Sequence, residues 1–416
     1  MLKTSSTQRR WIWACLLILG LSACGSSNQS PPPNPEGQRG DLVAATLVTT
    51  FSVQAVNVWI TALRVLGVDT SGLDAKYGVA LYKIVYKTLT PDGRLINASG
   101  ALAYPLKLSG APSPVLSFQH ATLFLDSEAP SNSANTNEAL LVLAGIGYVA
   151  LMPDYIGYAE SGNEVHTFVQ AQGLAAAVID MLRASRRFLT DNNVATNGQL
   201  FLTGYSEGGY ATLAAQKEME QNLAAEFPIT ASMPAAGPYD LSSSLQYMVG
   251  ASINDNPQLL GFVFKAYDHW YRWNRINDIF QSPHNAVIAN HYDGQYSSGV
   301  VKAALTTTMA DLFTNSFRSA FLGKGETVVK SDLAANDIHN WAPRTPTRLF
   351  HGQDDMIVPY ANATTALAAM QSAGAADVAL IDCTTALPLI PRGHEECVPD
   401  YLTEVFSLFG TLANDL

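Results

Sequence analysis

The sequence predicts an α/β fold in which a mostly parallel central sheet is covered by helices, with a helical cap inserted in its second half. Short apolar runs of strand length recur along most of the chain, and segments with helical spacing of apolar residues separate them. That alternation is typical of a parallel sheet covered on both faces. Between about residues 239 and 343 the strand rhythm stops, and helix-like sequence rich in aromatic residues replaces it. The 416 residues, 48% of them hydrophobic, are enough to bury a large core.

The expected elements follow one another along residues 41–416, which we interpret as one domain without internal repeats. A turn signal at residues 91–93 (PDG) separates two early strands. The long helix at 167–189 carries apolar residues such as Leu174, Val178 and Met181 at helical spacing. We expect strands at 79–88, 95–105, 115–118, 148–152, 200–203, 229–233, 347–350 and 378–381, and further helices at 137–144 and from 210.

The motif Gly-Tyr-Ser-Glu-Gly-Gly at residues 204–209 lies between an expected strand and an expected helix. A strand, a Gly-x-Ser-x-Gly turn and a helix form a nucleophile elbow, in which a tight turn holds the serine hydroxyl clear of the sheet. Side chains at Gly204 or Gly208 would obstruct that turn. We therefore predict that Ser206 is a nucleophile, which needs a base and an orienting acid to become reactive.

Residues 351–359 (HGQDDMIVP) resemble the acid turn of α/β-hydrolases, His-Gly-x-x-Asp-x-x-Val-Pro. The resemblance implies that Asp355 is the catalytic acid; its neighbour Asp354 fits a turn residue, and His351 fits a structural residue at the end of a strand. In this fold the order along the chain is serine, acid, histidine. His394 is the one histidine that follows the acid, and so we predict that it is the base.

An oxyanion hole completes such a site. One donor is the backbone N–H of the residue after the nucleophile, here Glu207, and the other comes from the loop after an early strand. Residues 119–122 (QHAT) resemble the Gln-His-Gly-Thr of many secreted hydrolases, with Ala121 where glycine is usual. The second donor is therefore either Ala121 or Thr122, and His120 is interpreted as shaping the loop.

The motif Pro-Asp-Tyr-x-Gly at residues 153–157 adds to the resemblance. Together with Gly-Tyr-Ser-x-Gly-Gly and a cap in this position, it is similar to the lipase A-type secretory lipases and their bacterial esterase relatives, over roughly residues 75–410. We interpret Asp154, His166 and Asp180 as structural. Most aromatic residues of the cap, about 239–343, are expected to form its own core, with a few lining an apolar acyl pocket.

The N-terminus has the pattern of an export signal. Three basic residues precede an apolar run at 11–21 that is too short to span a bilayer as a helix. Residues 21–24 (LSAC) resemble a bacterial lipobox, which implies a signal peptide at 1–23 and an acylated Cys24; the alternative is ordinary cleavage and secretion. A Pro-rich linker at 24–40 would follow. We therefore expect an exported lipoprotein of the outer membrane, cell surface or periplasm.

Two further cysteines, Cys383 and Cys397, lie on either side of His394. In an oxidising compartment such an even pair predicts a disulfide bond, although two free buried thiols would also fit. A disulfide here would hold the loop that presents the base.

Composition narrows the class of function. A net charge of −11 and few charged residues (14%) argue against binding to nucleic acid or to anionic lipid through charge. Because no zinc spacing, P-loop or dinucleotide motif is present, we expect neither a metal nor a cofactor. The sequence thus predicts a serine carboxylic-ester hydrolase that acts on apolar esters through an acyl-enzyme. The alternative is a prolyl-oligopeptidase-type or aminopeptidase-like serine peptidase, which would hold a peptide terminus with charged residues in its pocket.

Overall fold

The computed structural model describes residues 37–108, 110–133, 138–383 and 392–416. Within them, nine strands form one sheet in the order β1-β2-β3-β5-β4-β6-β7-β8-β9. The strands from β5 to β9 along this order are parallel, whereas β1, β2 and β3 pair antiparallel at one edge. The strands are β1 (Leu42–Phe51), β2 (Val79–Leu89), β3 (Leu95–Pro105), β4 (Ser113–Gln119), β5 (Val149–Pro153), β6 (Thr196–Tyr205), β7 (Ala231–Ala235), β8 (Thr347–His351) and β9 (Val378–Asp382).

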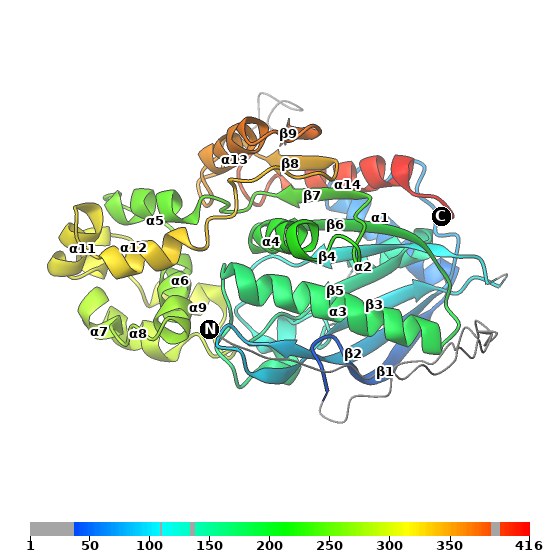
Figure 1. Cartoon of the computed structure of the whole chain (residues 1–416), viewed down its shortest axis with the longest axis horizontal. Helices are drawn as coiled ribbons and strands as arrows, with labels where there is room; N and C mark the ends of the chain where they lie inside the picture. The colour runs from blue at the N-terminus through cyan, green and yellow to red at the C-terminus, as the bar shows by residue number, and fades with distance from the viewer. Residues whose placement is uncertain (1–36, 109, 134–137, 384–391) are drawn as a thin grey trace, which may run out of the picture. The chain divides into compact units, whose positions relative to one another are not determined.

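Helices cover both faces of this sheet (Figure 1). One layer contains α3 and α4, and the opposite layer contains α1, α2 and α14. The predicted fold class, a mostly parallel sheet with helices on both sides, is therefore confirmed. These helices are α1 (Val53–Val65), α2 (Glu138–Ile146), α3 (Ala171–Asp191), α4 (Glu207–Asn222), α13 (Ala361–Ser372) and α14 (Val398–Leu412).

The first strand and helix were not anticipated from the sequence. No glycine or proline separates β1 from α1; the single residue Ser52 lies between them and caps α1 by accepting a hydrogen bond from the N–H of Ala55. Residues 37–40 of the expected linker contact the folded unit, because Arg39 forms an ion pair with the buried Asp180, 2.9 Å apart. The expected signal peptide and the part of the expected linker before residue 37 lie outside the described residues.

The long helix α3 begins four residues later than the helical spacing indicates. Gln170 caps it, since its side-chain oxygen accepts the N–H of Gly173. Val169 just before it has a left-handed backbone (φ 44°), which is incompatible with a regular helix at that point.

Eight helices between β7 and β8 lie at one end of the sheet, where a cap was expected (Figure 1). Their aromatic residues pack on one another around the buried Phe264, which contacts the rings of Phe280, Phe313 and Phe317. The same apolar cluster continues into α3 and α4, so the cap shares a core with one face of the sheet. These helices are α5 (Leu241–Gly250), α6 (Pro257–Trp270), α7 (Ile276–Ile279), α8 (His284–Asn290), α9 (Ser298–Ala303), α10 (Met309–Leu312), α11 (Asn315–Leu322) and α12 (Thr327–Ala334).

Candidate active site

Ser206 lies on the sharp turn between β6 and α4. Its backbone is in the left-handed region (φ 59°), a strained conformation for a residue with a side chain. The turn needs small neighbours: a Cβ at Gly208 would collide with the carbonyl oxygen of Gln119, and one at Gly204 with the carbonyl oxygen of Gly208. This is the local geometry of a nucleophile elbow.

His394 and Asp355 follow Ser206 by 188 and 149 residues in the chain (394 − 206 and 355 − 206), and the fold brings the three residues together. His394 Nε2 is 2.8 Å from Ser206 Oγ, and His394 Nδ1 is 2.6 Å from Asp355 Oδ2. Ser206 follows β6, Asp355 follows β8, and His394 precedes α14, so each side chain is held at the carboxyl end of the parallel strands or beside it. Such a chain of two hydrogen bonds allows the imidazole to take a proton from the serine hydroxyl.

The Asp355 carboxylate is fully enclosed by hydrogen-bond donors. Its Oδ1 accepts the backbone N–H groups of Ile357 and Val358, both at 2.8 Å, and His351 Nε2 lies 3.0 Å from Oδ2. Burial raises the pKa of the Asp355 carboxyl, but the hydrogen bonds from His351 and His394 outweigh it and hold that pKa well below its usual value. Asp355 therefore remains ionised and keeps accepting from His394.

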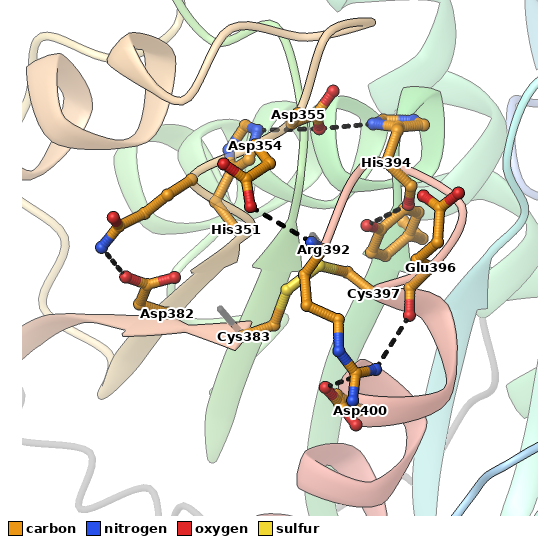
Figure 2. The surroundings of a disulfide bond; sticks show 12 residues. His351, Asp354, Asp355, Asp382, Cys383, Arg392, His394, Glu396, Cys397 and Asp400 are labelled. Atoms are coloured by element: carbon orange, nitrogen blue, oxygen red, sulfur yellow. Dashed lines mark hydrogen bonds and ion pairs between the residues drawn. A yellow bond between two sulfur atoms is a disulfide. The ribbon is translucent and has the colours of Figure 1, made fainter. Parts of the chain in front are cut away.

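Asp354 takes a different part in the same turn. Its Oδ2 accepts the backbone N–H of Arg392 at 3.2 Å, on the segment that carries His394 (Figure 2). Asp354 thus holds the loop of the histidine, whereas Asp355 bonds to the histidine ring.

Three contacts hold the backbone segment that carries His394. A disulfide bond joins Cys383, just after β9, to Cys397, just before α14 (Figure 2). The buried hydroxyl of Tyr205 donates to the backbone carbonyl of His394 at 2.6 Å. Arg392 forms an ion pair with Asp400, 3.2 Å apart, in the first turn of α14. Residues 384–391, within the disulfide loop, lie outside the described residues.

The two candidates for the second oxyanion donor differ in position. Thr122 lines a small cavity together with Ser206 and Glu207, whereas Ala121 is exposed and does not line it. His120 is buried, with Nδ1 2.7 Å from the carbonyl of Ala121 and Nε2 3.3 Å from the carbonyl of Asp154. The geometry is in keeping with the interpretation of His120 as a residue that shapes the loop.

Asp154 forms hydrogen bonds with two serine hydroxyls away from Ser206. The carboxylate is fully buried and accepts from the hydroxyls of Ser99 at 2.5 Å and Ser131 at 2.6 Å. Burial raises the pKa of this carboxyl. Its hydrogen bonds connect β3 to the loop after β5, which fits the structural role expected for it.

The sequence did not predict a buried side-chain contact next to Ser206. The side chain of Glu207, considered only for its backbone N–H, extends inward and places Oε1 2.6 Å from Nε2 of His166. Both side chains are almost fully buried. The two residues are 41 positions apart, and no local motif pairs them.

The cavity beside Ser206 has a volume of about 60 Å³ and an apolar wall. It lies between the end of the sheet and the first two cap helices, α5 and α6. Its apolar lining includes Phe168, Val169, Pro238, Leu241, Leu245, Met248, Leu259, Leu260, Val263, Ile357 and Val358. A cavity of this size holds only a few non-hydrogen atoms.

One group of side chains has the composition of a cation site. Ligand atoms of Asp240, Asp337 and His339 lie within 4.8 Å of one another where the chain enters and leaves the cap. Both carboxylates already accept hydrogen bonds from the first turn of α5: Asp240 from Ser243, and Asp337 from Ser242. These bonds account for both aspartates as helix-capping residues, so we assign no metal to the group.

None of the helices in the described part of the chain combines the length and the hydrophobicity needed to cross a bilayer.

Comparison with known proteins identifies the family. A model of the secretory lipase family matches residues 128–391, more than half of the chain. The esterase LipA of Xanthomonas oryzae, described as degrading the rice cell wall, is 27% identical, with a TM-score of 0.79 over 90% of this chain and 99% of its own. A Legionella pneumophila protein is 25% identical, with a TM-score of 0.80 over 89% of this chain and 98% of its own. Candida antarctica lipase A, 16% identical, shares the fold with a TM-score of 0.58 over 83% of this chain and 77% of its own. No curated protein matches the sequence.

Proposed function

The chain belongs to the secretory lipase family and is a hydrolase of the esterase and lipase class, and from this premise we propose that it cleaves short-chain apolar esters through an acyl-enzyme on Ser206. The observation that carries the proposal is the pair of hydrogen bonds from Ser206 to His394, 2.8 Å, and from His394 to Asp355, 2.6 Å.

Each residue of this chain of contacts has a role in the proposed reaction. His394 Nε2 takes the proton as Ser206 Oγ attacks the ester carbonyl carbon, and Asp355 stabilises the imidazolium that results. The tetrahedral intermediate expels the alcohol, which receives the proton from His394. A water molecule, activated in turn by His394, then releases the acid and restores the serine.

Backbone donors stabilise the oxygen that becomes negative. The N–H of Glu207 at the start of α4 is one donor, and the position of Thr122 beside Ser206 favours its N–H over that of Ala121 as the other. Losing one such donor typically costs roughly 10²- to 10³-fold in turnover.

The apolar cavity supports a substrate with a small apolar acyl group. At about 60 Å³ it accommodates a few carbon atoms beyond the carbonyl, and residues of the first two cap helices form part of its wall. The scarcity of charged side chains in this lining disfavours the peptidase alternative. Among the described residues around the cavity, Glu207 is the one ionisable side chain, and its carboxylate already contacts His166. It therefore offers no free charge to a peptide terminus.

Membership of a secretory family supports export, and Cys24 within its lipobox-like sequence supports a lipid anchor as the finer proposal. Mass spectrometry of the membrane fraction is expected to find a mature chain that begins at acylated Cys24. A soluble chain cleaved elsewhere, or an unmodified Cys24, would exclude the anchor.

The proposed reaction is tested with p-nitrophenyl esters of rising chain length beside aminoacyl anilides. Ser206→Ala is expected to abolish ester turnover while the melting temperature stays near that of the wild type. His394→Ala should be about as damaging, since residues that act as a unit do not contribute additively. Near-normal turnover by Ser206→Ala, or a preference for the anilides, would contradict the proposal.

A further inference from the structure

The side chains of His166 and Glu207 contact each other next to Ser206, the proposed nucleophile. Glu207 follows Ser206 in the chain, and both residues line the cavity. Glu207 is 1% exposed and His166 is 3% exposed, so neither side chain is solvated by bulk water. Glu207 Oε1 is 2.6 Å from His166 Nε2, and Glu207 Oε2 has no hydrogen-bond partner among the described residues. A bare carboxylate in such surroundings is costly unless its charge is balanced.

The second ring nitrogen of His166 determines the protonation of the pair. His166 Nδ1 is 2.8 Å from the backbone carbonyl oxygen of Ile156. A carbonyl oxygen only accepts, and so Nδ1 carries a hydrogen. The short contact between Nε2 and Glu207 then needs one more hydrogen, because a lone pair on Nε2 would otherwise face a carboxylate. That hydrogen lies either on Nε2, giving an imidazolium and a carboxylate, or on Glu207, giving two neutral groups. The net charge is zero in both cases.

In the described part of the chain, no neighbouring group supplies a charge that would balance Glu207 in place of this proton. The titratable groups found there around the pair are His120 from the loop after β4, Tyr155 and Tyr158 from the loop after β5, and His394 beyond Ser206. Burial lowers the pKa of His120, and burial raises the pKa of Tyr155 and Tyr158 well above the usual value. These three groups are therefore neutral, and helix α6 contributes the apolar ring of Phe262, 5.4 Å from that of His166.

We propose that His166 is a positioning residue. It shares one proton with Glu207 and so keeps this buried pair of side chains, next to Ser206, free of net charge. The inference rests on the proposed function, in which negative charge develops on the ester oxygen beside the N–H of Glu207. An unbalanced carboxylate on the same residue would oppose that charge in a water-poor site, where Coulombic interactions are strong. The pair also ties the first turn of α4 to the loop at Ile156 through His166.

The test is the pH dependence of kcat for His166→Leu relative to the wild type. Without the imidazole, a negative charge on the buried Glu207 carboxylate has no partner to balance it, and a rise in pH favours that charge. The ratio of kcat, variant over wild type, is expected to fall by about tenfold or more between pH 6 and pH 9. KM should change much less.

A second substitution separates charge from packing. In H166L/E207Q no carboxyl remains to ionise, so the kcat ratio should be independent of pH and at pH 9 should exceed that of H166L. If H166L does not fold, His166→Asn serves for the same measurement. A pH-independent ratio for the single variant, or a double variant no faster than the single one at pH 9, overturns the proposal.

Two controls complete the experiment. Arg39→Leu removes an ion-pair partner from Asp180, a buried carboxylate of α3 that is not part of the site. It should lower the melting temperature and leave kcat unchanged at every pH. Ester turnover that survives Ser206→Ala overturns the proposed function and this inference with it, whereas a flat ratio with turnover that depends on Ser206 overturns the inference alone.

Discussion

His351 Nε2 lies 3.0 Å from Asp355 Oδ2, the same carboxylate oxygen that lies 2.6 Å from His394 Nδ1. His351 Nε2 is also 2.9 Å from the carbonyl oxygen of Val358. Because that carbonyl only accepts, Nε2 carries a hydrogen, which it shares between the carbonyl and the carboxylate. His351 therefore fixes the carboxylate of Asp355, which in turn orients the ring of His394.

His351→Leu should lower kcat by on the order of 10-fold, because a buried hydrogen bond to a charged group is lost. His351→Gln keeps an N–H donor at a similar reach and is expected to restore much of the rate. Steady-state kinetics of both variants, with melting temperatures as a control for folding, checks the prediction. Equal losses in the two variants would mean that His351 acts through packing alone.

The neighbouring aspartates should respond very differently to the same change. Asp355→Asn is expected to lower turnover by on the order of 10⁴-fold, since the amide disturbs the tautomer of His394. Asp354→Asn should cost much less, because the amide oxygen can still accept the N–H of Arg392. A folded Asp354→Asn variant that proved the more damaging of the two would reverse the assignment of the acid.

Acid stability should depend on Asp355. Hydrogen bonds from His351 and His394 hold its folded-state pKa well below the unfolded value of about 3.9. The carboxylate therefore stabilises the folded state above roughly pH 4, and this contribution is lost as the pH falls through that value toward the folded-state pKa. Chemical unfolding from pH 3 to pH 7 should show a difference in free energy of unfolding between wild type and Asp355→Asn that shrinks on acidification. A difference that does not vary with pH would contradict this.

The disulfide should support stability and activity together. The bond between Cys383 and Cys397 closes a loop with a sequence separation of 14, worth roughly 3 kcal/mol in the chain-entropy model. Replacing both cysteines by alanine should lower the melting temperature, and it should lower kcat because the same loop carries His394. Non-reducing peptide mapping of the wild type provides the control. Two thiols open to alkylation in the native protein would refute the pairing.

The size of the cavity should set the preferred acyl chain. Leu245 of α5 is buried in its wall, so Leu245→Ala should shift kcat/KM toward longer p-nitrophenyl esters by about 10-fold relative to the acetate. Leu333→Ala, a buried cap residue away from the cavity, should lower stability and leave the preference unchanged. The same shift in both variants would point to loosening of the cap as a whole.

Local motifs were sufficient to predict the fold class and to select Ser206 as the candidate nucleophile. The turn around Ser206 requires glycines at fixed positions, and the turn around Asp355 has its own pattern, so both can be recognised from neighbouring residues. The expected strands and helices agree with the structure to within a few residues, because their apolar patterns report burial directly. The first strand and helix were missed, since Ser52 joins them without a recognisable turn signal.

The sequence by itself determined which side chains can carry the chemistry: a serine on a strained turn, an aspartate in a family-like turn, and a histidine that follows them in order. The tertiary structure decided how those groups are held. It placed His351 on the carboxylate of Asp355, Asp354 on the backbone of Arg392, and His166 on the side chain of Glu207. The last two of these contacts join residues 38 and 41 positions apart, and all three depend on which way a side chain points once the sheet has formed. Hydrogen bonds of that kind leave no periodic or local signal, because their cause is the packing of the folded chain.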